Sequence, residues 1–120
     1  MRRFEWDEEK AKENERKHGI SFERAIEVFD DPLQISKRNR IENGEQRFQI
    51  IGRIEANILI IVIHTVQENG IEIIRIISAR PLSSSERRVY EHGSIQKRRN
   101  TANDAGRRGK TKGIGRKTRR

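Results

Sequence analysis

The sequence contains no cysteine, and only 32% of its residues are hydrophobic. The absence of cysteine excludes a disulfide framework and any thiolate metal site. Because 38% of the 120 residues are charged, the chain permits one domain with a small core drawn from a few segments. The longest apolar run, residues 58–63, is too short to cross a bilayer, and acidic residues follow Arg2 and Arg3 where a signal peptide needs an apolar stretch. We therefore expect a cytoplasmic protein with no membrane partner.

The positive charge is concentrated in the last part of the chain. Residues 1–93 hold 16 Lys and Arg against 17 Asp and Glu, a net of −1, whereas residues 94–120 hold 11 against 1, a net of +10. The last segment has too few apolar residues to offset the entropy of ordering it. We predict a folded domain over 1–93 and a disordered basic tail over 94–120. The tail either has little consequence or adds salt-sensitive, sequence-blind affinity for nucleic acid.

Two helices are predicted in the first third of the chain. Asp7 suits the N-cap of the first, and Gly19 suits the position directly after its end. Ser21 can cap the second helix, in which apolar residues recur at helical spacing over residues 22–29. The acidic pair before Pro32 ends this helix, because the residue before a proline is pushed out of the helical conformation.

Four strands are predicted next. They span residues 33–41, 46–53, 57–65 and 71–80. Asn43-Gly44 and Asn69-Gly70 have the composition of tight hairpin turns. The third strand is continuously apolar, which is typical of a strand that is covered on both faces or central in its sheet.

A final helix is predicted after the last strand. Ser83 and Glu86 have the spacing of a capping box, and we expect the helix to reach His92 and Gly93. The predicted order is therefore two helices, four strands and one helix. The short connections between strands favour an α+β fold, with an antiparallel four-stranded sheet and its helices against one face.

Arginine is the residue type that points most clearly to a function. Arginines at the end of a strand and at the start of the following helix suit anion binding, and cleavage of a phosphodiester such as RNA without a metal would need a base, an acid and cations that stabilise charge developing on the phosphate. The guanidinium group suits the last role, because it stays charged and pairs with two phosphate oxygens. Alternation along the last strand puts Ser78 and Arg80 on one face and Arg75 on the other, unless a bulge intervenes. Arg80 is therefore the preferred candidate.

The histidines and the tyrosine allow more than one interpretation. His64, at the end of the buried third strand, can serve as acid or base near neutral pH, although its position fits a half-buried structural histidine better. His18 and His92 complement the ends of helices. Tyr90 either stacks on a base or faces the core. Three scattered histidines without a paired-carboxylate motif do not form a metal-binding pattern, so we expect no metal or cofactor.

A series of short motifs runs through residues 4–91. Its members are Phe4-Glu5-Trp6-Asp7, Lys10, Asn14, Lys17-His18-Gly19-Ile20, Phe22, Ala25, FQIIGR (48–53), His64-Thr65, RIISAR (75–80), Glu86-Arg87 and Tyr90. Together they resemble the BrnT-type toxins of bacterial toxin–antitoxin pairs. The resemblance implies a RelE-like α+β fold and a ribonuclease that arrests growth by cutting RNA without a metal. It also implies a BrnA-type antitoxin, through which the complex contacts operator DNA.

Two features depart from the family pattern. Residues 66–70 form a longer turn than is usual and contain no arginine, and the basic tail lies outside the resemblance.

We expect RNA to lie across a sheet face. The catalytic candidates are His64 as acid or base and Arg80 and Arg53 as phosphate ligands, and the candidate substrate-binding residues are Lys17, His18, Arg87 and Tyr90. The alternative hypothesis is a non-catalytic protein, either a degenerate toxin that still binds its antitoxin or a nucleic-acid tether that acts through the tail.

Overall fold

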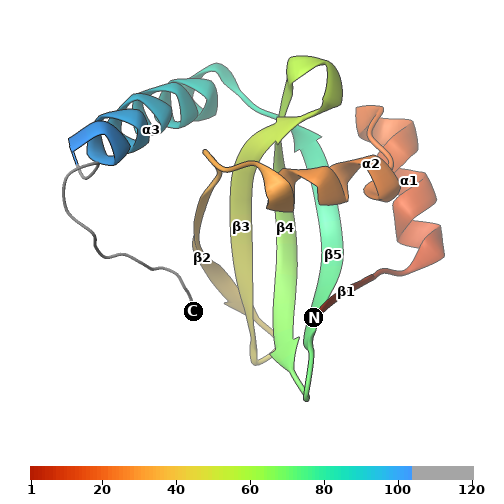
Figure 1. Ribbon diagram of the computed structural model, residues 1–120. Helices are drawn as coiled ribbons and strands as arrows, with labels where there is room; N and C mark the ends of the chain where they lie inside the picture. Colours follow the sequence, from red (N-terminus) through yellow and green to blue (C-terminus); the bar gives the residue numbers. More distant parts are fainter. Residues whose placement is uncertain (104–120) are drawn as a thin grey trace.

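The computed structural model describes the fold of residues 1–103 and the side chains of residues 1–93 (Figure 1). Its elements are β1 (Arg2–Glu5), α1 (Glu8–His18), α2 (Phe22–Ala25), the 3₁₀ helix η1 (Ile26–Asp30), β2 (Ile35–Glu42), β3 (Glu45–Ile54), the 3₁₀ helix η2 (Glu55–Asn57), β4 (Ile58–Glu68), β5 (Glu72–Pro81) and α3 (Ser84–Asn103). The strands form one sheet in the order β1-β5-β4-β3-β2. β1 runs parallel to β5, and the other neighbours are antiparallel.

The prediction of an α+β fold is confirmed, but the prediction of a four-stranded antiparallel sheet is wrong. The missed strand is β1, which adds a fifth and parallel member. It has only four residues, and it pairs with β5 about 70 residues further along the chain, Arg2 with Glu72. A strand this short shows little alternation, so its pairing partner was not recognisable from the local sequence.

The sheet separates two apolar clusters. Side chains alternate between the two faces along each strand. Ile50 lies on the face covered by α1, α2 and η1, and Ile51 lies on the opposite face, where Tyr90 of α3 packs. We call these the α1 face and the α3 face. The expectation that all helices lie against one face is therefore wrong. The first cluster is the larger, and it includes Phe22 and Val28, which are fully buried.

A β-bulge in β5 decides which of its side chains share a face. The β4–β5 pairing shifts between Ile63 and His64, and Ile77 is left as an extra residue on β5. One extra residue moves the alternation by one position. Arg75 and Arg80 consequently both project from the α3 face, which is the case that the prediction of opposite faces excepted, since a bulge intervenes.

The side chain of Asn14 bonds the edge of β5 where β1 no longer covers it. β1 pairs only with the first part of β5, up to Arg75. Further along, the N–H of Ala79 donates to Asn14 Oδ1 at 3.1 Å, and Asn14 Nδ2 donates to the carbonyl of Ala79 at 2.8 Å. Nδ2 also donates to the carbonyl of Ile20 at 3.2 Å. This amide replaces the bonds of a neighbouring strand and ties α1 to the sheet.

The final helix begins as predicted and ends later. The N–H of Glu86 donates to Ser83 Oγ and the N–H of Ser83 donates to the Glu86 carboxylate, which confirms the capping box. The helix continues past Gly93 to Asn103. A single glycine costs a helix only about 1 kcal/mol relative to alanine, and the residues after it include good helix formers. Residues 94–103 of the predicted basic tail thus lie within α3, and residues 104–120 lie outside the described part.

None of the helices described is long and apolar enough to span a membrane.

Replacing Asn14 with alanine should destabilise the protein, because the N–H and C=O of Ala79 would lose their buried partner. We expect the free energy of unfolding to fall by about 2–3 kcal/mol, measured by urea denaturation. Lys12→Ala, at an exposed position on the same helix, should change it by less than about 0.5 kcal/mol. Equal effects of the two substitutions would contradict the role of Asn14.

Candidate active site

Two of the three predicted catalytic residues lie on one face at one end of the sheet. Arg53 of β3 pairs with Leu59 of β4, and Arg80 of β5 pairs with Ile61 of the same strand. Both arginines therefore project from the α3 face. Their Cα atoms lie roughly 12 Å apart, from two strand spacings and an offset of two residues.

The two guanidinium groups meet consecutive turns of α3. Arg80 binds Glu86, and the guanidinium carbon of Arg53 lies 5.9 Å from the centre of the Tyr90 ring. Residues four apart lie on the same side of a helix, about 6 Å apart along its axis. The cations are thus arranged along one side of α3, at the C-terminal ends of two strands.

Arg80 is held by a carboxylate. Its Nη1 and Nη2 donate to the two oxygens of Glu86 at 2.9 and 2.8 Å, and Nη1 also donates to the carbonyl of Pro81 at 3.2 Å. The hydrogen bond from Arg80 is the main reason that the pKa of Glu86 falls to about 2, and the same bond raises the pKa of Arg80. The pair is fully ionised at neutral pH, and an arriving phosphate would share Arg80 with Glu86.

Arg53 differs from Arg80 in this respect. Among the ion pairs of the described residues none includes Arg53, whose side chain is exposed. Its guanidinium group rests on an aromatic face, an arrangement that stabilises a cation while leaving its N–H donors available. Arg53 is consequently the cation best placed to receive an anion here.

Tyr90 packs beneath the guanidinium group of Arg53 and is only 1% exposed. Its ring packs in the apolar cluster of Ile51, Leu59 and Ile61, and its hydroxyl donates to Asp31 Oδ2 at 2.8 Å. A ring buried in this way has no open face for a nucleobase. The sequence left stacking and core packing open for Tyr90, and its position corresponds to core packing.

The other predicted substrate-binding residues surround the site unevenly. Arg87 is exposed on α3, directly after Glu86. Lys17 and His18 end α1 and are exposed. Since Asn14 ties this helix to β5, they lie near the same end of the sheet but belong to the helix that packs on the α1 face.

His64, the third catalytic candidate, does not join the arginines. It pairs with Phe48 across the sheet and projects from the α1 face, where it is 5% exposed. The ring of Phe29 meets it edge-on at 4.9 Å, and the ring of Phe48 stacks on it at 6.0 Å. Burial lowers the pKa of His64 from 6.5 to about 4, and within the described structure its Nδ1 has no hydrogen-bond partner.

The residue that sequence reasoning missed is Asp31, which was interpreted only as part of a helix end. Its Oδ2 accepts the backbone N–H of Arg53 at 2.8 Å as well as the hydroxyl of Tyr90, and its Oδ1 accepts the N–H of Leu33 at 2.9 Å. Two of these contacts connect residues 22 and 59 positions apart. Local patterns do not signal contacts at such separations.

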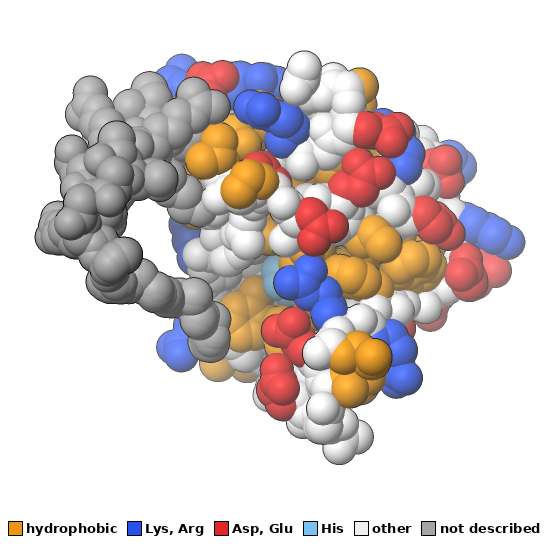
Figure 2. All heavy atoms as spheres, in the orientation of Figure 1, with side chains coloured by type: hydrophobic (Ala, Val, Ile, Leu, Met, Phe, Trp, Pro, Cys, Tyr) orange, Lys and Arg blue, Asp and Glu red, His pale blue; other side chains and the backbone are white. Residues whose placement is uncertain are grey.

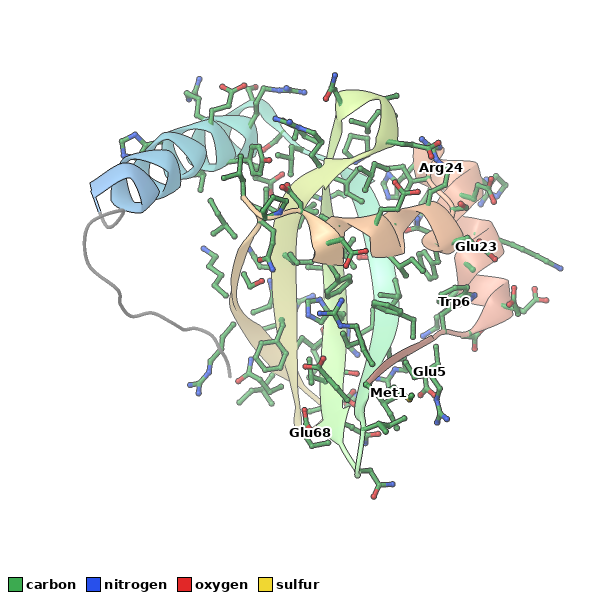
Figure 3. The ribbon with its side chains drawn as sticks, viewed as in Figure 1. Met1, Glu5, Trp6, Glu23, Arg24 and Glu68 are labelled. Atoms are coloured by element: carbon green, nitrogen blue, oxygen red, sulfur yellow. The ribbon has the colours of Figure 1, made fainter. Side chains whose placement is uncertain are left out.

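Two other arginines, Arg47 and Arg75, form ion pairs with glutamates, Arg47 with Glu42 at 2.9 Å and Arg75 with Glu45 at 2.7 Å. Figure 2 shows the α1 face, where acidic and basic side chains are interspersed without a continuous basic patch. An open hollow lined by Met1 and Glu68 lies at the other end of the sheet, as their labels in Figure 3 show. In the part of the chain that the structure describes, no three His, Asp or Glu side chains could hold a metal ion together.

Comparison with known proteins identifies the class. Residues 6–86 match the family model described as the ribonuclease toxin BrnT of type II toxin–antitoxin systems. A search of curated proteins found no match. The crystal structure of the Brucella abortus ribonuclease toxin BrnT is 32% identical, with 69% of this chain and 97% of that chain covered and a TM-score of 0.49.

The family match therefore places the chain among the ribonuclease toxins of type II toxin–antitoxin systems. The chain belongs to the BrnT family, as its motifs predicted, and membership implies an antitoxin partner.

The burial of His64 predicts a specific dependence of stability on pH. Because its pKa is about 4 when folded and 6.5 when unfolded, its contribution is fully present above pH 6.5 and is lost as the pH falls toward 4. The difference corresponds to about 3 kcal/mol. In urea denaturation between pH 7 and 4, the free energy of unfolding should fall less steeply with pH for His64→Leu than for the wild type. Parallel curves for the two proteins would contradict this assignment.

Proposed function

We propose that this chain is an endoribonuclease that cleaves RNA without a metal, and that Arg53 and Arg80 hold the scissile phosphate on the α3 face. The observation that carries the proposal is the position of these two guanidinium groups along one side of α3. In this reaction a ribose 2′-oxygen gives its proton to water and attacks the phosphate, and the P–O5′ bond breaks. The products are a 2′,3′-cyclic phosphate and a 5′-hydroxyl that takes its proton from water, and negative charge develops on the phosphate oxygens during the attack. Guanidinium forks held in place stabilise that charge, which is a large part of the catalysis.

The roles within the site follow from the partners of each residue. Arg53 binds the phosphate directly, since no carboxylate among the described residues neutralises it. Arg80 binds the phosphate while Glu86 keeps it oriented, and Arg87 attracts the neighbouring backbone. His64 lies on the other face, and we propose that it acts in packing and not as acid or base.

We further propose that a cytoplasmic BrnA-type antitoxin neutralises the toxin, and that the complex contacts operator DNA through the antitoxin. Family membership supports the partner. The net charge of residues 1–93 is −1, so this part of the chain has no general positive field, which supports contact with DNA through the antitoxin.

Incubation of the purified protein with RNA in the presence of EDTA tests the chemistry. We expect cleavage by the wild type and a loss of about a hundredfold or more in Arg53→Ala and Arg80→Ala, each with a melting temperature near that of the wild type. Arg38→Ala is the matched control, because this exposed arginine pairs with Phe48 on the α1 face and should keep full activity.

Two outcomes would count against the proposal. Cleavage abolished by EDTA would contradict metal independence. An inactive wild type would support the alternative of a non-catalytic, antitoxin-binding protein, an alternative that the pairing of Arg80 with Glu86 favours.

Induced expression in a bacterial host tests the biological role. The chain alone should arrest growth, and co-expression of the reading frame next to its gene should restore growth, because the antitoxin binds and blocks the toxin. Arg53→Ala should not arrest growth and should still co-purify with the product of that reading frame. Arrest by Arg53→Ala as strong as that of the wild type would argue against an RNA-cleaving mechanism at this site.

A further inference from the structure

We propose that Asp31 is a positioning residue for Arg53. It binds the backbone N–H of Arg53, and it binds Tyr90, the residue on whose ring the guanidinium group of Arg53 rests. The inference rests on the proposed role of Arg53 in binding phosphate. Asp31 lies directly after η1, and its carboxylate accepts bonds from the N–H of Leu33, the N–H of Arg53 and the hydroxyl of Tyr90. It thereby joins the end of η1, strand β3 and helix α3.

The first link is to the backbone of Arg53. The N–H of Arg53 donates to Asp31 Oδ2 at 2.8 Å, near the end of β3. The approach depends on Gly52, since a Cβ atom there would lie 2.7 Å from Val28 Cγ2 and 3.0 Å from Asp31 Oδ2. The neighbouring residue thus lacks a side chain where the carboxylate passes close to the strand.

The second link runs through α3. Tyr90 donates its hydroxyl to the same Oδ2 at 2.8 Å, and its ring is the surface over which the guanidinium carbon of Arg53 lies at 5.9 Å. The ring is buried against the sheet, so packing sets its position together with the hydrogen bond that its hydroxyl donates to Asp31. Asp31 therefore controls both the strand position and the ring position that together locate Arg53.

A carboxylate is needed here and an amide is not equivalent. Three donors converge on Asp31, two on Oδ2 and one on Oδ1. Asparagine has one accepting oxygen, so its NH₂ group would face either the N–H of Leu33 or the pair of donors from Arg53 and Tyr90. Either orientation leaves at least one donor unpaired, and the substitution changes the site without a change in side-chain size.

The neighbouring residue Asp30 supplies a matched control. It has the same chemistry one position earlier, but its side chain is 85% exposed, and among the described residues its ion-pair partner is Arg2, at 3.7 Å. Asp30→Asn should therefore alter RNA cleavage by less than about twofold.

A double-mutant cycle on kcat/KM for RNA cleavage tests the inference. We expect Asp31→Asn to lower kcat/KM by about tenfold, and Tyr90→Phe, which keeps the ring and loses only the hydroxyl, to lower it less. In the Arg53→Ala background, Asp31→Asn should change kcat/KM by less than about twofold, because the group that Asp31 positions is gone. Melting temperatures report folding for each variant separately.

The outcomes separate this inference from the proposed function. If Asp31→Asn lowers kcat/KM equally in both backgrounds, Asp31 acts on general stability and the inference is wrong. If Asp31→Asn does not fold, Tyr90→Phe replaces it in the cycle with Arg53→Ala. An equal loss of kcat/KM from Tyr90→Phe in both backgrounds would then show that the inference is wrong.

If the wild type does not cleave RNA, the proposed function is wrong. The cycle is then measured on the affinity for a 2′-deoxy-substituted oligonucleotide, where additive effects of Asp31→Asn and Arg53→Ala would overturn the inference.

Discussion

A buried strand must have a partner for every backbone N–H and C=O, and the way β5 meets this requirement shapes the rest of the molecule. β4 bonds one edge over its whole length, whereas β1 bonds the other edge only in the first half. Further along this edge, the amide of Asn14 bonds the N–H and C=O of Ala79. These bonds hold α1 beside the sheet. The end of β5 carries Arg80, which binds Glu86 of α3.

The two faces of the sheet differ in their apolar clusters and in their charged groups. The α1 face holds the larger apolar cluster and the buried His64, whose neutral form packs between two aromatic rings. The α3 face holds a smaller cluster, and arginines lie where it reaches the end of the sheet. Because residues 1–93 carry a net charge of −1, the proposed affinity for phosphate depends on this local arrangement.

Local chemistry made several elements predictable. Asn43 and Gly44 adopt positive φ in the β2–β3 hairpin, and Gly19 adopts the left-handed conformation after α1, as their residue types indicated. The capping box of α3 likewise involves residues three apart. The short strand β1 was not predictable in this way, because it depends on a partner strand distant in the sequence.

By itself, the sequence determined the family, the turns and caps, and it singled out Arg53 and Arg80, which we propose as phosphate ligands. The tertiary structure alone decided which residues meet. One extra residue at Ile77 changed the face of Arg75, and strand pairing put His64 on the face away from Arg80. The physical reason is that caps and turns are bonds within a few residues, whereas a site is assembled from contacts such as Asp31 with Tyr90, 59 positions apart, which depend on how the whole sheet pairs and packs.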